Sequence, residues 1–426
     1  MKVFDGSEVG WRGNLVKNSR GEVTTSIHNL MLILEKHSAF SGVFRYNEFA
    51  NTVEIRKRVD WPRVATDPFS ETDATEITRW LGEAETFALN AKRANVMEAV
   101  EAVAFRNRFH PVREYLDGLT WDRKPRIRTM FETYFGAPPG DYAARVGEIF
   151  LTGAVARIYE PGVKVDTMVV FEGPQGAGKT RVTRELFSPP WYAEAMESPA
   201  SKDFYQSLAG KWGIEIGEME SFSKAEVNKV KQALSAQADT YRASYGRYAK
   251  SYPRQCVFVG TTNDDHYLRD PTGARRFLPV RVSGVKVEEV GRVRDQLWAE
   301  AVHRYRAKSD FWTLPQAAAE EQDARYLDDS WTDLVAYWLT GSAGEKAYPP
   351  DLDHRTAEDG GGIQSTTTSD VLQWALGIDV GKHGKPEQMR IAVLMKRLGW
   401  VSRQIGAKRQ RRWVRETTAK AMEPPF

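Results

Sequence analysis

The middle of the chain alternates short apolar runs with stretches of helical spacing. Residues 166–171, 211–218 and 254–260 are short segments whose apolar residues predict three buried strands. Between them, residues 181–187 and 224–236 carry the spacing of helices. Strands that alternate with helices predict an α/β sheet with its ligand site at the carboxyl ends of the strands.

The first part of the chain has a different pattern, typical of a mixed α+β module. Residues 29–34 are apolar and compatible with a helix, residues 52–59 alternate like a strand, and residues 72–89 have helical spacing. Nothing in this module has the spacing of catalytic residues. His110 is more simply structural than catalytic, because a lone histidine has no visible partner in the sequence.

The last part of the chain contains a second small module. Residues 341–368 are rich in Gly, Pro, Ser, Thr and Asp, a composition typical of a linker. Residues 369–426 then predict two helices followed by a basic hairpin, the order found in a winged helix-turn-helix. These patterns predict four parts, at residues 1–118, 119–340, 341–368 and 369–426.

Charge is spread unevenly, and the last module carries most of the positive charge. The whole chain has a net charge of +3, but residues 382–415 contain eleven Lys or Arg and one acid, a balance of +10, so the rest sums to −7. A concentrated basic module favours a polyanion as its partner. Trp400 and Trp413 within it favour a folded module over a solvated basic tail. The residues expected to contact DNA there are Lys408, Arg409, Arg411 and Arg412.

Composition also excludes some classes of protein. The single cysteine, Cys256, rules out an intrachain disulfide and makes a cysteine-based metal site implausible. No apolar run approaches the length of a membrane span, and the N-terminus lacks the pattern of a signal peptide. We therefore expect a cytoplasmic protein with no membrane partner.

A phosphate-binding motif lies between the first predicted strand and the helix that follows it. The motif G-x-x-x-x-G-K-[ST] is matched by Gly173, Pro174, Gln175, Gly176, Ala177, Gly178, Lys179 and Thr180. Glycines let the loop point its N–H groups inward around phosphate at a helix N-terminus. Lys179 would reach the β- and γ-phosphates, and the Thr180 hydroxyl would ligate Mg²⁺. A chance glycine-rich turn is the weaker interpretation, because strand and helix flank the motif as it requires. We expect ATP and Mg²⁺ as cofactors.

Hydrolysis needs a carboxylate near Mg²⁺ and a group that activates water. We expect Glu218, just after the second strand, to supply both. Glu215 lies three residues upstream, and residues three apart in a strand point to opposite faces, so the two should not share a site unless Gly217 bends the chain. Glu220 lies on the same side as Glu218 and is an alternative. The choice among the three stays open.

Two further features follow the third strand. Asn263 ends that strand, where an amide can orient water against the γ-phosphate as a sensor residue. Arg275 and Arg276 lie on the next loop, which suits an arginine finger that reaches the nucleotide of a neighbouring subunit. A solvated or salt-bridged arginine pair is the alternative, and the sequence does not tell which arginine is the finger.

Aromatic and cationic residues alternate over residues 240–252, which predicts a β-hairpin. In the channel of a ring, such a hairpin would present cations to phosphates and tyrosines to bases. We expect Tyr245, Arg247 and Lys250 to contact DNA. The alternative is an edge hairpin with ordinary cross-strand aromatic pairs.

Together these motifs resemble the virulence-associated E (VapE-like) family of phage and prophage ATPases, which look like superfamily 3 helicases of the AAA+ group. The resemblance is strong over about residues 105–310. The segments that carry it are residues 110–116, 171–179, 212–218, 241–247, 253–263 and 273–280, with Trp121 and Asp122. It implies a P-loop NTPase core of that type, with a mixed α+β N-terminal module and a small winged-helix-like C-terminal module.

The resemblance also implies a function. Members would form rings, as homo-hexamers, and act as DNA helicases or translocases in mobile-element replication within a bacterial host cell. Single-stranded and forked duplex DNA would be partners, with a separate primase, since no metal-binding carboxylate cluster that would supply one is visible. The residues implied to act are Lys179 and Thr180 at ATP and Mg²⁺, Glu218 as acid, Asn263 as sensor, and Arg275 with Arg276 as the trans-acting finger. One departure is that superfamily 3 motors place adjacent acids after the second strand, whereas Gly217 here separates Ile216 from Glu218.

Two other functions remain as alternatives to a helicase. A DNA-dependent ATPase switch or loader would use the same site without unwinding DNA. A P-loop kinase for a small molecule is disfavoured by the hairpin, Asn263 and the arginine pair.

Overall fold

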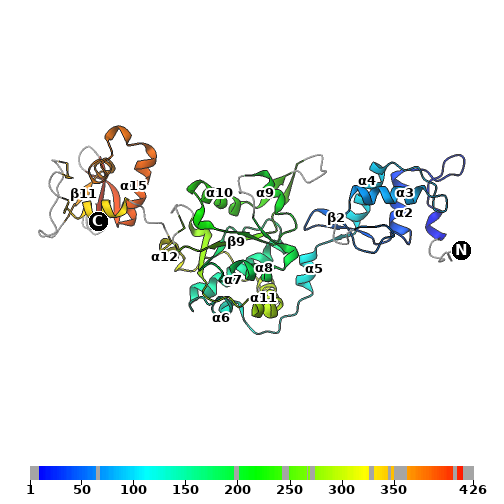
Figure 1. Ribbon diagram of the computed structural model, residues 1–426, viewed down its shortest axis with the longest axis horizontal. Coiled ribbons are helices and arrows are strands. Elements are labelled where there is room, and N and C mark those ends of the chain that lie inside the picture. The colour runs from blue at the N-terminus through cyan, green and yellow to red at the C-terminus, as the bar shows by residue number, and fades with distance from the viewer. Residues whose placement is uncertain are drawn as a thin grey trace, which may run out of the picture. The chain divides into compact units, whose positions relative to one another are not determined.

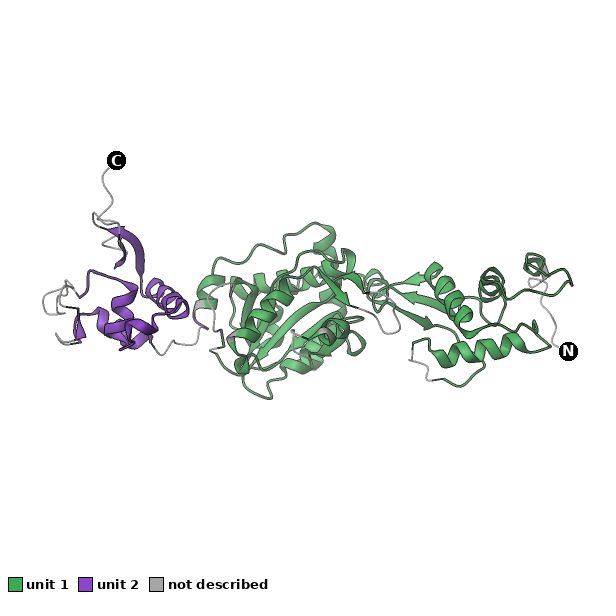
Figure 2. Ribbon diagram, turned by 90° about the horizontal axis from the view of Figure 1, so that it is seen from above, with its two compact units in different colours: residues 1–267, 273–322 green, residues 268–272, 323–426 purple. Residues whose placement is uncertain are grey.

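The computed structural model of the protein forms two compact units, each described here by itself (Figures 1 and 2). One unit comprises Met1–Tyr267 and Gly273–Gln322, and the other comprises Leu268–Thr272 and Asp323–Phe426. The structure describes residues 9–63, 68–195, 201–241, 249–265, 267–268, 274–325, 331–343, 347–349, 362–405 and 410–415. Within these ranges, no helix is long and apolar enough to span a membrane.

A five-stranded parallel sheet lies at the centre of the first unit, in the order β10-β4-β9-β6-β5. Its strands are β4 (Met168–Glu172), β5 (Tyr192–Glu194), β6 (Gly213–Ile216), β9 (Val257–Thr262) and β10 (Phe277–Arg281). The α/β sheet expected from the sequence is therefore confirmed, with β4, β6 and β9 at the three predicted strands. These three strands are buried along their whole length, as expected of parallel strands covered on both faces.

Helices cover both faces of this sheet (Figure 1). On one side lie α6 (Met130–Phe135), α7 (Asp141–Tyr159), α8 (Lys179–Phe187) and α11 (Val287–Arg306); on the other lie α9 (Lys202–Ser207) and α10 (Lys224–Ser235). Trp212 and Trp298 join the sheet to the first layer, with ring centroids 4.1 Å apart. Each indole N–H donates to a helix carbonyl, Trp212 to Ala154 and Trp298 to Leu186, so neither polar group is left unpaired in the core.

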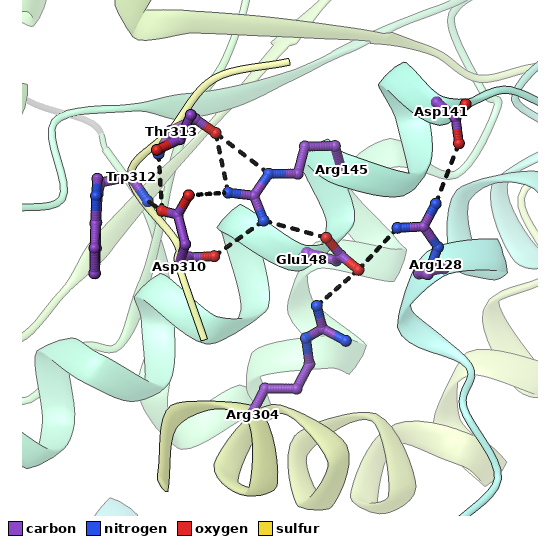
Figure 3. Close-up of polar contacts among 8 residues, drawn as sticks. All are labelled: Arg128, Asp141, Arg145, Glu148, Arg304, Asp310, Trp312 and Thr313. Carbon is purple, nitrogen blue, oxygen red and sulfur yellow. Dashed lines mark hydrogen bonds and ion pairs between the residues drawn. The ribbon is translucent and has the colours of Figure 1, made fainter. Parts of the chain in front are cut away.

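A buried carboxylate fastens the helices of this layer to one another. Glu148 of α7 accepts hydrogen bonds from Arg128 at 3.1 Å and Arg145 at 3.2 Å, and forms an ion pair with Arg304 of α11 at 2.7 Å (Figure 3). Arg145 also pairs with Asp310, which binds the segment after α11 to the same cluster. Three arginines around one buried acid make this cluster a structural clamp between α7 and α11.

The N-terminal residues form a small mixed sheet with helices. Its strands are β1 (Phe44–Asn47), β2 (Thr52–Ile55) and β3 (Arg108–Phe109), with β1 antiparallel to β2 and parallel to β3. Its helices are α1 (Val9–Arg12), α2 (Ile27–Lys36), α3 (Glu71–Gly82), α4 (Arg93–Arg106) and α5 (Pro111–Asp117). These elements have their own hydrophobic cluster yet belong to the same compact unit as the large sheet. The boundary at residue 118 stays a prediction.

Contacts at the turn after β1 join this part to the large sheet. The Phe49 carbonyl accepts from the Gly210 amide at 3.1 Å. His110 caps α5 by accepting from the Arg113 amide, and its other ring nitrogen lies 2.6 Å from the Gln255 amide oxygen. Burial lowers the pKa of His110. These contacts give this histidine a structural place between the two sheets.

The base of the expected hairpin consists of β7 (Ala238–Tyr241) and β8 (Lys250–Pro253), which pair antiparallel. The rings of Tyr241 and Tyr252 stack across the pair, with centroids 4.6 Å apart. The residues between these two strands, which include Tyr245 and Arg247 of the expected hairpin, lie outside the described residues. Immediately before β9, Cys256 is buried, and burial raises the pKa of its thiol to about 11.

The second unit contains helices and a three-stranded antiparallel sheet in the order β11-β13-β12. Its elements are α13 (Thr332–Leu339), β11 (Ser365–Thr366), α14 (Thr368–Asp370) continued by the π-helical turn η8 (Val371–Ala375), α15 (Lys385–Arg397), β12 (Trp400–Ile405) and β13 (Gln410–Arg415). The short helix α12 (Ala318–Asp323) ends where this unit begins. Trp338 of α13 is buried in the same cluster as Trp400 and Trp413, so a helix before the predicted linker contributes to this core.

Candidate nucleotide-binding site

The glycine-rich loop runs from the end of β4 to the first turn of α8, and its backbone explains two of its glycines. Gly178 precedes α8 with φ of 91°, a left-handed conformation that glycine adopts without steric cost. At Gly173 a β-carbon would lie 2.3 Å from the carbonyl oxygen of Val282, closer than atoms can approach. The motif therefore reflects both the shape of the loop and the approach of the segment after β10.

Lys179 begins α8 and is almost buried, with 8% of its surface exposed. Its ammonium group donates to the carbonyls of Gly173 at 2.6 Å and Pro174 at 3.0 Å, and to the amide oxygen of Asn263 at 3.0 Å. Burial lowers its pKa, while the nearby carboxylates of Glu220 and Glu215 oppose that shift. The structure thus brings the expected lysine and the expected sensor residue into direct contact.

Thr180, the next residue, contacts a carboxylate from β6. Its hydroxyl donates to Glu215 Oε1 at 2.6 Å, and the Thr261 hydroxyl donates to the same oxygen at 3.1 Å. The Tyr192 hydroxyl donates to Glu215 Oε2 at 2.8 Å. Glu215 is 3% exposed, and burial raises its pKa, an effect that the hydrogen bonds from Thr180, Tyr192 and Thr261 oppose.

A second carboxylate lies beside the sensor residue. Glu220 Oε1 accepts from the Asn263 side-chain amide at 2.9 Å and from the Asn263 backbone amide at 3.3 Å. Since Asn263 also contacts Lys179, the loop, the sensor and Glu220 form one connected group. This group lies at the carboxyl ends of β4 and β9, as expected for an α/β sheet.

Glu218 occupies a different position. It is exposed, with φ of 53°, and begins the turn that follows β6. Its carboxylate forms no hydrogen bond with any residue that the structure describes. The alternation used to place these acids applies to extended backbone, and the chain has left that conformation at this residue. Of the three acids considered, Glu215 contacts Thr180 and Glu220 contacts Asn263.

The two arginines lie in the short turn η5 (Ala274–Arg276) before β10. Arg276 Nε donates to the hydroxyl of Ser235, the last residue of α10, at 2.9 Å. Arg275 is exposed and makes no hydrogen bond or ion pair with the residues described.

The residues expected to contact DNA are only partly described. Lys250 begins β8 and is exposed. Arg411 is exposed on β13, whereas Arg412 donates to the hydroxyl and the carbonyl of Ser365 and so helps join β13 to β11. Lys408 and Arg409 lie outside the described residues.

Sequence reasoning missed Tyr192 and Thr261, which hold Glu215 from two other strands. No motif marks them. Thr261 could nevertheless have been found from the sequence, because it lies two residues before Asn263 on the strand expected to reach the site. No group of three or more His, Cys, Asp or Glu side chains in the described ranges could hold a metal ion.

The family model of the virulence-associated protein E-like domain matches residues 116–329, half of the chain. The chain belongs to the virulence-associated protein E-like family. The matched residues include the phosphate loop, the acids after β6, Asn263 and both arginines. The candidate site therefore lies entirely within the domain that defines this virulence-associated protein E-like family.

Other comparisons give weaker likenesses. None of the curated proteins matches the chain. An apo structure of the NrS-1 C-terminal region is 12% identical, covers 87% of this chain and 95% of its own, and has a TM-score of 0.46. An A-form apo structure of the same region is 13% identical, covers 90% and 99%, and has a TM-score of 0.47. A Thermotoga maritima RuvB mutant is 14% identical, covers 65% and 94%, and has a TM-score of 0.22. At these TM-scores the likenesses assign no function.

Proposed function

We propose that this chain is an ATP-dependent DNA helicase or translocase of a phage or mobile genetic element. The observation that carries the proposal is the contact of Lys179 with Asn263 beside the pair formed by Thr180 and Glu215. A phosphate-binding lysine, a sensor amide and an acid facing the P-loop hydroxyl are the parts that hydrolysis of a nucleoside triphosphate requires.

The residues fit ATP with Mg²⁺. The loop presents its backbone N–H groups at the start of α8, and Lys179 supplies a cation for the phosphates. Thr180 and Glu215 offer adjacent oxygens to Mg²⁺, and the divalent ion would neutralise charge on the phosphates. In this proposal Glu220 would deprotonate the attacking water and Asn263, which donates to it, would orient that water. This assignment uses Glu215 and Glu220 in place of Glu218.

In this proposal two elements bind DNA. The hairpin of β7 and β8 would enter the channel of a homo-hexameric ring, where Lys250 at its base, together with Arg247 and Tyr245, would contact DNA. The second unit carries the basic cluster, and we propose that its helices and three-stranded sheet act as a winged helix. Its cations would bind duplex DNA near the fork. We further propose that the protein works with a separate primase in the cytoplasm of a bacterial host.

Unwinding of a forked duplex with ATP and Mg²⁺ tests the proposal. We expect strand displacement by the full chain and none by its Lys179→Ala variant, which keeps the DNA-binding elements but loses a phosphate contact. Hydrolysis stimulated by DNA without displacement would instead favour the alternative of a switch or loader. A chain that binds no ATP would refute both.

A further inference from the structure

Two arginines from separate segments of the chain form hydrogen bonds with the carboxyl end of α10. The Ser235 hydroxyl accepts from Arg276 Nε at 2.9 Å and donates its proton to the Lys231 carbonyl at 2.9 Å, so both its donor and an acceptor position are used. The Ala233 carbonyl accepts from the guanidinium of Arg254. The turn before β10 and the segment before β9 are thus attached within one turn of the same helix.

Arg254 lies at the base of the hairpin. It is 2% exposed, and its guanidinium forms a two-point pair with the carboxylate of Asp239 on β7, one of whose hydrogen bonds measures 2.9 Å. Its backbone amide donates to the Gln237 carbonyl at 2.8 Å. A buried, doubly bonded arginine has little freedom, so the base of the hairpin and the end of α10 should move together.

The same base leads directly to the sensor residue. β9 begins three residues after Arg254 and ends beside Asn263, whose side chain contacts Lys179. A buried central strand is a rigid element, so a shift at one end of β9 reaches the other. The hairpin base is therefore connected to the nucleotide site of its own subunit through β9 and to the arginine turn through α10.

We infer that the two arginines have different roles. Arg276 is a positioning residue that fastens the η5 turn to the end of α10, and Arg275 is the finger that reaches the nucleotide of the neighbouring subunit. The end of α10 then couples the nucleotide at the subunit interface to the grip of the hairpin on DNA. This inference rests on the proposed ATP-driven ring.

Two observations assign the roles in this order. Arg276 already uses its Nε in a bond within its own subunit, and this bond would break if the side chain extended across an interface. Arg275 is exposed and has no hydrogen bond or ion pair to lose among the residues described. Ser235 contacts neither the phosphate loop nor the acids, so its substitution tests the coupling without touching the site.

The experiment measures how strongly the full chain binds a short fluorescent single strand, with and without a non-hydrolysable ATP analogue. The coupling factor is the ratio of the two dissociation constants, and couplings between sites are usually about 5- to 150-fold. We expect Ser235→Ala and Arg276→Ala to bring this factor close to one while nucleotide binding stays as in the wild type. The matched control is Ser235→Thr, which keeps the hydroxyl and should keep the factor.

Hydrolysis without DNA distinguishes the two arginines. Arg275→Ala should lower the rate of hydrolysis by about 10³-fold, the contribution of an arginine finger. Part of this rate should return when Arg275→Ala subunits are mixed with Lys179→Ala subunits. Ser235→Ala should stay within about twofold of the wild type, because positioning alone is lost. Arg276→Ala should lose less than Arg275→Ala.

Three results would overturn the inference. One is a Ser235→Ala protein with the wild-type coupling factor. Another is a larger loss of hydrolysis from Arg276→Ala than from Arg275→Ala. The last is a wild-type chain that unwinds DNA but binds it equally with and without the analogue. A chain that binds no nucleotide would instead refute the proposed function, so the two failures are distinguishable.

Discussion

The exchange of one buried oxygen for an amide nitrogen at Glu215 tests which acid serves the nucleotide. Glu215→Gln keeps the shape of a side chain that is 3% exposed. The carboxylate accepts from Thr180, Thr261 and Tyr192 at 2.6, 3.1 and 2.8 Å. A glutamine oxygen can keep one side of this arrangement, and the hydroxyl on the other side can rotate to accept from the new amide.

The expected magnitudes differ for folding and for catalysis. Folding loses the charge assistance of about one hydrogen bond, ~1–2 kcal/mol, but no longer buries a charge, so the net change should be about 1 kcal/mol or less. Catalysis loses the carboxylate that holds Mg²⁺, a contribution of several kcal/mol. Since about 1.4 kcal/mol corresponds to a tenfold change in rate, kcat should fall by about 10²- to 10³-fold.

The assay is steady-state ATP hydrolysis together with binding of a fluorescent ATP analogue. Glu218→Gln is the matched control, because it makes the same chemical change at an exposed position three residues away. We expect its kcat to stay within about threefold of the wild type, since no described hydrogen bond is lost. Normal turnover by Glu215→Gln, with a block in Glu218→Gln, would refute the reasoning and restore the acid expected from the sequence.

Four other outcomes are expected. Lys179→Ala should abolish ATP binding at equilibrium, and retained affinity would contradict the phosphate role. Glu148→Gln should destabilise the first unit by about 2–4 kcal/mol in denaturant unfolding, less than for a fully buried pair because its arginines are partly exposed, and an unchanged midpoint would contradict the clamp. Because burial raises the pKa of Glu215 and Mg²⁺ needs the charged form, apparent Mg²⁺ affinity should fall as the pH is lowered, beginning above the range in which an ordinary carboxyl group titrates, and a pH-independent affinity would count against this ligand. Deletion of residues 323–426 should weaken DNA binding and flatten its salt dependence while nucleotide binding persists, and a salt titration with unchanged slope would exclude the basic cluster.

Much of the central sheet could be predicted because buried parallel strands are continuous apolar runs. β4 and β9 have this pattern, and β6 has it except for the buried Glu215, whereas β5 has only three residues and is too short to stand out. β10 contains Pro279, which suppresses the signal of a strand. The proline is tolerated there because β10 lies at an edge of the sheet, where one side of the backbone needs no partner.

The candidate site was predictable only as far as local motifs reach. The phosphate loop and Asn263 follow from residues adjacent in the chain. The choice between Glu215 and Glu218 depends on where the chain leaves the extended conformation and on Tyr192 and Thr261, which come from other strands. The contribution of α13 to the second unit could not be predicted either. The linker-like composition after α13 suggested that this helix belongs to the preceding domain, whereas its Trp338 is buried in the core of the second unit.

The contacts at the turn after β1 also bear on how such a chain can be reassembled by recombination. Phe49 bonds to Gly210, and Gln255 bonds both to His110 and to the Glu48 carbonyl. Recombination near residue 118 would combine the N-terminal residues of one protein with the hairpin base of another, and the contacts of Gln255 and Gly210 with the N-terminal residues would then no longer match. We therefore expect natural and laboratory chimaeras to fold only when the N-terminal residues around Phe49 and His110 and the residues around Gly210 and Gln255 come from the same parent protein.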